Sequence, residues 1–231
     1  MIIDLIIPAL NEEHSLPLLL KAIDRRIIRD IIVADNGSTD DTATVATNSG
    51  ATVIHEDRRG YGYACMAGIN YCRAKSIPPD VLVFMDGDFA DDPDDLKKIL
   101  DPIVLNGADL VIGSRVSGTR ESGSLTVPQL FGNRLAGILI RIFSGVRFTD
   151  LGPFRAIRLS KLVEMNLKEM TYGWTVEMQL KAAKMKMKCV EVPVHYRRRH
   201  SGTSKVSGTL TGTILAGYRI LFVVFRFALL R

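Results

Sequence analysis

A dense run of aspartates near the middle of the chain is the part of the sequence best suited to do chemistry. The segment VFMDGDFADDP (83–93) begins as an apolar strand and ends in carboxylates, with Asp86 and Asp88 on either side of Gly87. Two carboxylates at a strand end can converge on one hard cation, and glycine lets the backbone turn closely there. Mg²⁺ and Mn²⁺ usually keep open positions for substrate phosphates. The pattern therefore predicts a Mg²⁺ or Mn²⁺ site that works on a phosphate-bearing substrate.

Short apolar runs in the first half of the chain predict the elements that position these aspartates. The runs are rich in Val and Ile and nearly continuous, which is typical of parallel strands buried on both faces. They span residues 2–8, 31–35, 51–55, 81–86 and 109–113. Helical stretches fill the gaps between them, at 12–29, 39–49, 62–75 and 93–106. Alternating strands and helices predict an α/β fold with a doubly wound, mostly parallel sheet flanked by helices.

Polar and glycine-containing segments follow the first four predicted strands. In order, they read PALNEE, DNGSTD, EDRRGYG and DGDFADD. In doubly wound sheets, ligands bind in the crevice beyond the carboxyl ends of the strands. We therefore expect the binding site at this edge of the sheet, with Asp86 and Asp88 inside it.

The second half of the chain has a less regular pattern. Residues 115–128 are rich in Gly, Ser and Thr, which predicts a mobile loop. Further helices are expected at 129–144 and 174–187, and short strands at 154–157 and 189–196. A basic, glycine-containing loop, RRRHSGTSKVSG, follows the last of these strands. We expect one folded domain over residues 1–207.

The last segment, 208–231, predicts an apolar helix that Arg219 and Arg226 interrupt. The two arginines are seven positions apart and therefore share one helix face. A membrane span needs about 20 clean apolar residues, so an amphipathic helix describes this segment better. It would lie in a membrane interface, or else pack on the sheet or in a homodimer.

Charge is divided unevenly along the 231-residue chain, whose formal net charge is +5. Residues 1–114 contain 10 Lys and Arg against 19 Asp and Glu, whereas residues 115–231 contain 20 against 6. An acidic half joined to a basic half fits a site where a metal meets phosphate, or a basic face turned to an anionic surface. Nucleic acid is not an expected partner, because the basic half lacks a face with interleaved aromatic residues for base stacking. The three cysteines lack metal-ligand spacing and predict reduced thiols in a cytoplasmic protein.

Six motifs in a fixed order resemble those of a known family. They are PALNEE, ADNGSTDDT, RRGYGYA, MDGDFADDP, GSR and TDLGPFRAI, and the resemblance covers about residues 1–207. Together they resemble a family 2 glycosyltransferase of the type A fold, near the dolichyl- and polyprenyl-phosphate mannose or glucose synthases and their bacterial relatives. The resemblance implies that residues 1–207 form the catalytic domain.

The resemblance also implies where a nucleotide-sugar donor would bind. The part that holds base and ribose corresponds to Pro8, Ala9, Leu10, Asn11, Glu12 and Asp35, with Gly60 in a turn that closes over the base. Asp86, Gly87 and Asp88 correspond to the paired aspartates that bind a divalent metal on the donor diphosphate. The synthases often carry Gln two residues further on, where this chain has Ala90, so Asp91 is the candidate for a third protein ligand.

The basic half of the chain is expected to contact the donor phosphates. Arg115 follows the fifth predicted strand in GSR and is placed to meet phosphate. Arg199, Gly202, Ser204 and Lys205 have the spacing of a loop that closes on the phosphates in the synthases. Guanidinium and ammonium groups suit phosphate oxygens, and a glycine lets backbone N–H groups approach them.

Four further residues are expected on the acceptor side. Asp150 resembles the family's acid near the acceptor, which would deprotonate an acceptor hydroxyl. A phosphate acceptor is already anionic, and Asp150 would then orient groups instead. Arg155 would face an acceptor phosphate or form a structural salt bridge. Trp174 and Glu177 resemble a wall of the acceptor site, with a plain core position as the alternative for Trp174.

These expectations describe a metal-dependent, inverting glycosyltransferase with Asp88, Asp150, Arg199 and Lys205 as catalytic residues. It would move a sugar from a UDP- or GDP-sugar to a polyprenyl phosphate, at the inner face of the membrane. One alternative is a sugar-phosphate nucleotidyltransferase, but the glycine-rich phosphate loop expected there after the first strand is missing from PALNEEHS. A second alternative is a non-catalytic nucleotide-sugar-binding or membrane-scaffold protein, against which the intact paired aspartates argue.

Overall fold

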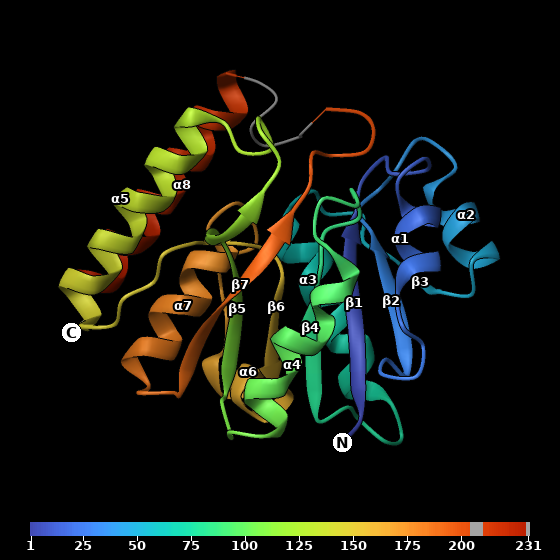
Figure 1. The fold of residues 1–231 in the computed structure, drawn as a ribbon, viewed down its shortest axis with the longest axis horizontal. Helices are drawn as coiled ribbons and strands as arrows, with labels where there is room; N and C mark the ends of the chain where they lie inside the picture. Colours follow the sequence, from blue (N-terminus) through green and yellow to red (C-terminus); the bar gives the residue numbers. More distant parts are fainter. Residues whose placement is uncertain (204–209, 230–231) are drawn as a thin grey trace.

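A seven-stranded sheet forms the centre of the molecule (Figure 1). The structure, a computed structural model, describes residues 1–203 and 210–229. Its strands are β1 (Ile3–Ala9), β2 (Asp30–Asp35), β3 (Thr52–His55), β4 (Val81–Phe84), β5 (Leu110–Arg120), β6 (Arg155–Arg158) and β7 (Cys189–Tyr196). They lie in the order β3-β2-β1-β4-β6-β5-β7, and only β6 runs antiparallel to its neighbours. The predicted doubly wound, mostly parallel sheet is confirmed.

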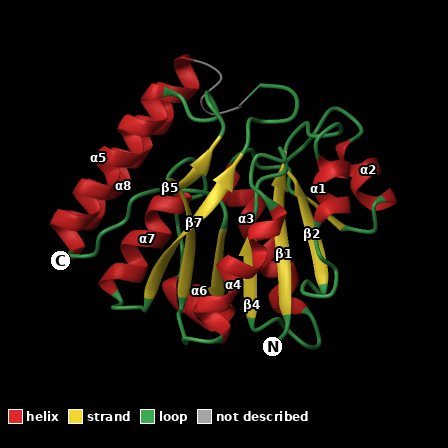
Figure 2. Ribbon diagram, viewed as in Figure 1, coloured by secondary structure: helices red, strands yellow, loops and turns green. Residues whose placement is uncertain are grey.

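Helices cover both faces of this sheet (Figure 2). Their bounds are α1 (Leu16–Ala22), α2 (Thr42–Asn48), α3 (Tyr61–Ala74), α4 (Leu96–Val104), α5 (Val127–Ser144), α6 (Leu159–Met165), α7 (Trp174–Lys184) and α8 (Leu210–Leu229), with a 3₁₀ turn, η1, at Pro93–Asp95. Ile6 of β1 packs in a core with α3, α5, α6, α7 and α8, whereas Ile7 packs in a second core with α1, α2 and α4. This alternation explains why the strand sequences are apolar without a polar face.

The register of the sheet brings the ends of its central strands to one edge. Ala9 at the end of β1 pairs with Asp35 at the end of β2. On the other side of β1, Ile6 pairs with Phe84, the last residue of β4. The loops after β1, β2 and β4 therefore start beside one another, as expected from the doubly wound pattern.

The prediction of a loop from residue 115 was wrong for its first half. Strand β5 continues to Arg120, and after a shift in register Thr119 pairs with His195 and Arg120 with Tyr196 of β7. This Gly-, Ser- and Thr-rich segment has no apolar pattern that would predict a strand. It is held in the sheet by backbone hydrogen bonds to β7. Helix α5 then begins directly after Thr126, whose side chain and that of Gln129 form a capping box.

Helix α8 packs against α5 at one end of the sheet (Figure 1). Val223 and Val224 are buried in the core that also contains α7. The rings of Phe143 and Phe225 meet edge to face, with centroids 6.2 Å apart. No helix in the described part of the chain is long and apolar enough to cross a membrane.

Candidate active site

The paired aspartates lie directly beyond the carboxyl end of β4. Asp88 Oδ1 accepts the N–H of Ala90 at 3.0 Å, which turns the backbone and leaves Oδ2 directed at other groups. Burial, followed by the charge of Asp88, raises the pKa of Asp86 to about 7. Asp86 Oδ1 is buried and has no hydrogen-bond partner among the described residues. An unpartnered carboxylate oxygen beside a second carboxylate suits a bound cation, because the cation would supply the positive charge that both groups lack.

Asp91 is buried close to this pair, and its Oδ1, like that of Asp86, has no hydrogen-bond partner among the described residues. Its Oδ2 accepts the N–H of Asp86 at 3.4 Å, and its carboxyl is buried. Burial, then the charges of Asp86 and Asp88, raises the pKa of Asp91 well above its usual value. Within residues 1–203 and 210–229, no group of three or more His, Cys, Asp or Glu is arranged to hold a metal. Asp91 as a third ligand stays a prediction, and two carboxylates alone fit a metal whose other ligands come from a bound substrate.

Arg199 of the basic loop reaches Asp88, the second of the paired aspartates. Its Nη1 donates to Asp88 Oδ2 at 3.2 Å, and its Nη2 donates to Glu12 Oε1. The backbone N–H of His200 also donates to the carbonyl oxygen of Asp88, at 3.1 Å. The structure thus joins the loop after β7 to the loops after β1 and β4. Ser204 and Lys205 lie outside the described residues.

The loops after β1 and β2 are tied together at the expected donor side. Pro8 and Ala9 form the end of β1, and Leu10 leads into a left-handed turn at Asn11, whose φ is 55°. Asn11 Oδ1 accepts the N–H of Thr39 at 2.8 Å, and the Asn11 N–H donates to Ser38 Oγ at 3.0 Å. The side chain of Asn11 therefore fixes how these two loops lie against each other.

Asp35 is held from both sides by neighbouring groups. Its Oδ1 accepts the N–H of Ser38 at 3.1 Å, and its Oδ2 lies 3.2 Å from His55 Nδ1. His55 ends β3, the strand beside β2. A single histidine at a strand end carries no spacing signal, so the sequence alone does not single out His55.

Gly60 lies where no other residue fits. Its φ is 147°, and a Cβ built there would lie 2.5 Å from the carbonyl oxygen of Met170. The Gly60 N–H donates to Asn36 Oδ1 at 2.8 Å, while Asn36 Nδ2 donates to the carbonyl oxygens of Glu56 and Arg58. Asn36 organises this turn, a role that its place in DNGSTD did not reveal.

Asp150 and Arg115 pair with each other in the interior. Arg115 donates to the Asp150 carboxylate from its backbone N–H, Nε and Nη2, at 2.8, 2.8 and 2.7 Å. Asn133 Nδ2 and the Leu151 N–H donate to the same carboxylate, at 2.7 and 2.8 Å. Burial disfavours the charged guanidinium, but the charge and hydrogen bonds of Asp150 raise the pKa of Arg115 overall. These contacts favour the orienting role for Asp150 over the role of a base.

Arg155 does not take either of its two predicted positions. It is fully buried, and it donates to the carbonyl oxygens of Leu151, Gly152 and Thr175. The ion pairs of the described residues do not include it. Burial lowers its pKa to about 10. Arg155 instead ties the segment after Asp150 to the start of α7.

Trp174 and Glu177 are also inside the molecule. Trp174 is fully buried and meets the ring of Phe84 edge to face at 5.1 Å, as its core alternative predicted. Glu177 accepts the backbone N–H groups of Lys168 and Glu169. The structure does not bring either side chain to a surface where an acceptor could touch it.

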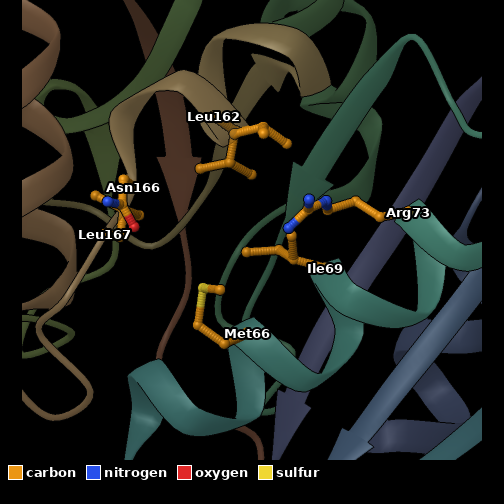
Figure 3. A pocket seen from close by; sticks show the side chains of 7 residues that line it. Met66, Ile69, Arg73, Leu162, Asn166 and Leu167 are labelled. Atoms are coloured by element: carbon orange, nitrogen blue, oxygen red, sulfur yellow. The ribbon is translucent and has the colours of Figure 1, made fainter.

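A small cavity, lined mostly by apolar residues, lies elsewhere in the molecule (Figure 3). It measures about 70 Å³ and lies between α3 and α6, with Met66, Ile69 and Leu162 on its walls. Arg73 is its one charged lining residue. None of the residues that line this cavity belongs to the group around Asp86 and Asp88, so the cavity is not part of the candidate active site.

Comparison with known proteins agrees with this arrangement. Residues 4–164 match the model of glycosyl transferase family 2. This chain belongs to that family. The match decides against the sugar-phosphate nucleotidyltransferase and the non-catalytic binding protein.

Several glycosyltransferases resemble this family 2 member along most of its length. An uncharacterized glycosyltransferase of Mycobacterium tuberculosis is 36% identical over 216 residues, which cover 93% of this chain and 94% of the relative. The undecaprenyl-phosphate mannosyltransferase of Micrococcus luteus is 34% identical over 220 residues, 90% of this chain and 88% of the relative. The polyprenol monophosphomannose synthase of Mycolicibacterium smegmatis is 30% identical, covering 88% and 80%.

Solved glycosyltransferase structures share its fold. Glucosyl-3-phosphoglycerate synthase from Mycobacterium tuberculosis, in complex with Mn²⁺, UDP and glucosyl-3-phosphoglycerate, superposes with a TM-score of 0.75. The similarity covers 98% of this family 2 chain and 80% of the synthase, at 20% sequence identity. At that identity the likeness establishes the type A fold and no more.

Proposed function

We propose that this glycosyltransferase transfers a sugar from a UDP- or GDP-sugar to a polyprenyl phosphate. The observation that carries the proposal is the contact of Arg199 with Asp88 and Glu12 at the carboxyl end of β4, where Asp86 also lies, next to the loops after β1 and β2. Carboxylates and a guanidinium at one strand end suit a metal-bound diphosphate. One relative, at 34% identity, is named an undecaprenyl-phosphate mannosyltransferase. Another, at 30% identity, is named a polyprenol monophosphomannose synthase.

Asp86 and Asp88 are the residues that would hold Mg²⁺ or Mn²⁺. The cation would supply positive charge for the departing diphosphate. Arg199 would donate to phosphate oxygens from the opposite side, and Lys205 would do the same. Asn11 and Asp35 would orient the nucleoside, because their loops are already fixed to each other. The acceptor oxygen would attack the anomeric carbon from the face opposite the diphosphate, with inversion.

The surroundings of Asp150 favour an acceptor that is already ionised. Among the described residues, five N–H groups reach its carboxylate, and they come from Arg115, Asn133 and Leu151. A general base needs a free lone pair directed at the acceptor proton, and these donors occupy both oxygens. A phosphate acceptor needs no such base, whereas a hydroxyl acceptor does. Asp150 would instead hold Arg115 in place beneath the site.

The surface formed by α5 and α8 would bring the enzyme to a membrane. Both helices expose large apolar side chains, namely Val127, Phe131, Ile138, Ile142 and Phe143 on α5, and Leu215, Tyr218, Phe222 and Phe225 on α8. Neither helix contains an acidic residue, and Arg134, Arg141 and Arg226 are exposed on them. Apolar side chains with arginines between them suit an anionic bilayer surface. The enzyme would act there as a peripheral protein on the cytoplasmic side, and a homodimer through the same surface is the competing arrangement.

A transfer assay tests this function. Purified protein is given UDP- or GDP-sugars with Mn²⁺ or Mg²⁺, and either a polyprenyl phosphate or the matching polyprenol without phosphate. Sugar should appear only on the phosphate, with the anomeric configuration inverted. Asp88→Asn should abolish transfer, whereas Asp92→Asn, which changes the cap of η1, should retain it. Equal transfer to the polyprenol would overturn the assignment of a phosphate acceptor. If neither transfer nor donor hydrolysis occurs with any nucleotide-sugar, the proposed function is overturned.

A further inference from the structure

The guanidinium of Arg199 occupies the oxygen of Asp88 that a cation would need. Asp88 Oδ1 is taken by the N–H of Ala90, which leaves Oδ2 as the oxygen toward the site. Arg199 Nη1 donates to this Oδ2 at 3.2 Å. The other end of the guanidinium, Nη2, donates to Glu12. One arginine therefore bridges the acid after β1 and the second aspartate after β4.

This position is built by more than one ion pair. The side chains of Arg199, Asp88 and Glu12 are 19%, 12% and 8% exposed, so water screens the bridge only in part. Arg199 Nε also donates to the carbonyl oxygen of Ser201, at 2.7 Å. The hydroxyl of Ser201 in turn lies 2.8 Å from that of Ser15, at the start of α1. These contacts fix the guanidinium in its place between the two acids.

We infer that Arg199 and the divalent cation are alternative counter-ions for Asp88, so that the cation binds strongly only together with the nucleotide. The inference rests on the proposed function, because it needs the cation to bind at Asp88. A cation alone must displace a guanidinium that two carboxylates already hold. A nucleoside diphosphate changes this balance, since its phosphate oxygens give the released guanidinium new partners of the kind it binds best. Arg199 then opposes the bare cation and assists the cation–nucleotide pair.

Arg197 provides a matched control in the same segment. Its Nη2 pairs with Asp92 at 2.8 Å, and its guanidinium lies over the ring of Phe89. Neither partner is one of the two paired aspartates. Arg197→Gln therefore removes the same charge from the same stretch of chain without freeing Asp88.

Binding of Mn²⁺, followed by the loss of its free-ion electron paramagnetic resonance signal, tests the inference. With Mn²⁺ alone, Arg199→Gln should bind roughly tenfold more tightly than wild type, the size expected when a charged hydrogen-bonded competitor is removed. With saturating UDP or GDP the order should reverse. The Mn²⁺ affinity of Arg199→Lys should fall between those of wild type and Arg199→Gln, because an ammonium lacks the fork that spans both acids. Arg197→Gln should match wild type, and melting curves show that each variant is folded.

The possible failures are distinguishable. If wild type binds Mn²⁺ in the presence of UDP or GDP, but Arg199→Gln binds Mn²⁺ alone no better than wild type, the exchange of counter-ions is overturned and the metal site stands. An equal gain in Arg197→Gln would also overturn it, because the effect would then be one of general charge. If no variant binds Mn²⁺ with either nucleotide, the metal dependence in the proposed function fails and the inference fails with it.

Discussion

Arg115 and Asp150 form a two-point ion pair in the interior, with Nε–Oδ2 and Nη2–Oδ1 distances of 2.8 and 2.7 Å. The two residues come from β5 and from the segment before β6, so the pair links strands that are neighbours in the sheet. The Arg115 guanidinium also lies over the ring of Tyr196 in β7, 5.0 Å from its centre. The pair therefore links β5, the segment before β6 and β7.

Replacement of Asp150 by Asn should cost mostly stability. Asn cannot accept all five N–H groups, and it leaves the Arg115 charge buried without a partner. Breaking a buried pair in this way costs about 3–5 kcal/mol in the free energy of unfolding. Urea denaturation measures this, with Glu164→Gln, which breaks an exposed pair with Lys161, as the control that should show little change. A folded Asp150→Asn protein of normal stability that lacks turnover would show instead that Asp150 is a base.

The stability of the protein without added metal should fall as the pH rises from about 4 to about 7. The pKa of Asp86 is raised to about 7, whereas an unfolded aspartate has a pKa of about 3.9. Between these values the folded protein keeps a proton that the unfolded chain has released. The contribution of Asp86 is therefore fully present below about pH 4 and lost as the pH reaches about 7. Asp91, whose pKa is also raised, changes stability in the same direction.

Denaturation curves at pH 5, 6 and 7.5 check this expectation. Asp86→Asn should flatten the dependence on pH relative to wild type without removing it, because Asp91 remains. Mn²⁺ binding in the presence of nucleotide should strengthen over the same rise in pH, since the metal needs the ionised carboxylate. Equal slopes for wild type and Asp86→Asn would show that Asp86 does not titrate in this range.

Gly60→Ala should weaken donor binding and stability together. The added Cβ would lie 2.5 Å from the Met170 carbonyl oxygen, in a backbone conformation that L side chains rarely adopt. The turn must shift, which would disturb the hydrogen bond from Gly60 to Asn36. We expect a loss of about 1–3 kcal/mol in the free energy of unfolding, and weaker UDP or GDP binding by calorimetry. Gly132→Ala in α5, where a Cβ meets nothing within 4 Å, should leave stability equal or slightly higher.

The parallel half of the sheet was predictable from sequence because burial on both faces leaves a local signal. The run that became β4 is apolar throughout, and the run that became β1 is apolar except for the buried Asp4 and the near-end Pro8. Asp86 comes directly after the apolar residues 81–85. The polar segments after these strands then had to meet at one edge. The location of the paired aspartates follows from local sequence alone.

The other half depends on partners that are distant in sequence. The extension of β5 to Arg120 is stabilised by β7, some 75 residues further along the chain, and no apolar pattern announces it. The donors to Asp150 come from Arg115 and Asn133, and those around Arg155 are carbonyl oxygens that any residue can provide. Burial of an arginine among carbonyl groups has no signature in composition or spacing. For this reason the sequence does not predict the position of Arg155.

The surface of α5 and α8 gives the prediction about membrane binding. Phe131 and Ile142 of α5 are 68% and 67% exposed, and Tyr218 of α8 is 62% exposed, so none of them contributes much to the core. Their transfer to a bilayer interface would be favourable, and the neighbouring arginines would add roughly 1 kcal/mol each near an anionic surface. We therefore expect binding to anionic vesicles that weakens with added salt.

Phe131→Ser combined with Ile142→Ser should reduce vesicle binding at least tenfold and leave the melting temperature nearly unchanged, because both side chains are already exposed. Sedimentation with vesicles of anionic and of neutral lipid measures the loss. Ile77→Ser, at an equally exposed apolar residue on another part of the surface, is the control that should bind as wild type does. The competing arrangement is a homodimer through the same surface. In that case the double variant would become monomeric in analytical ultracentrifugation, and the unaltered protein would not sediment with either kind of vesicle.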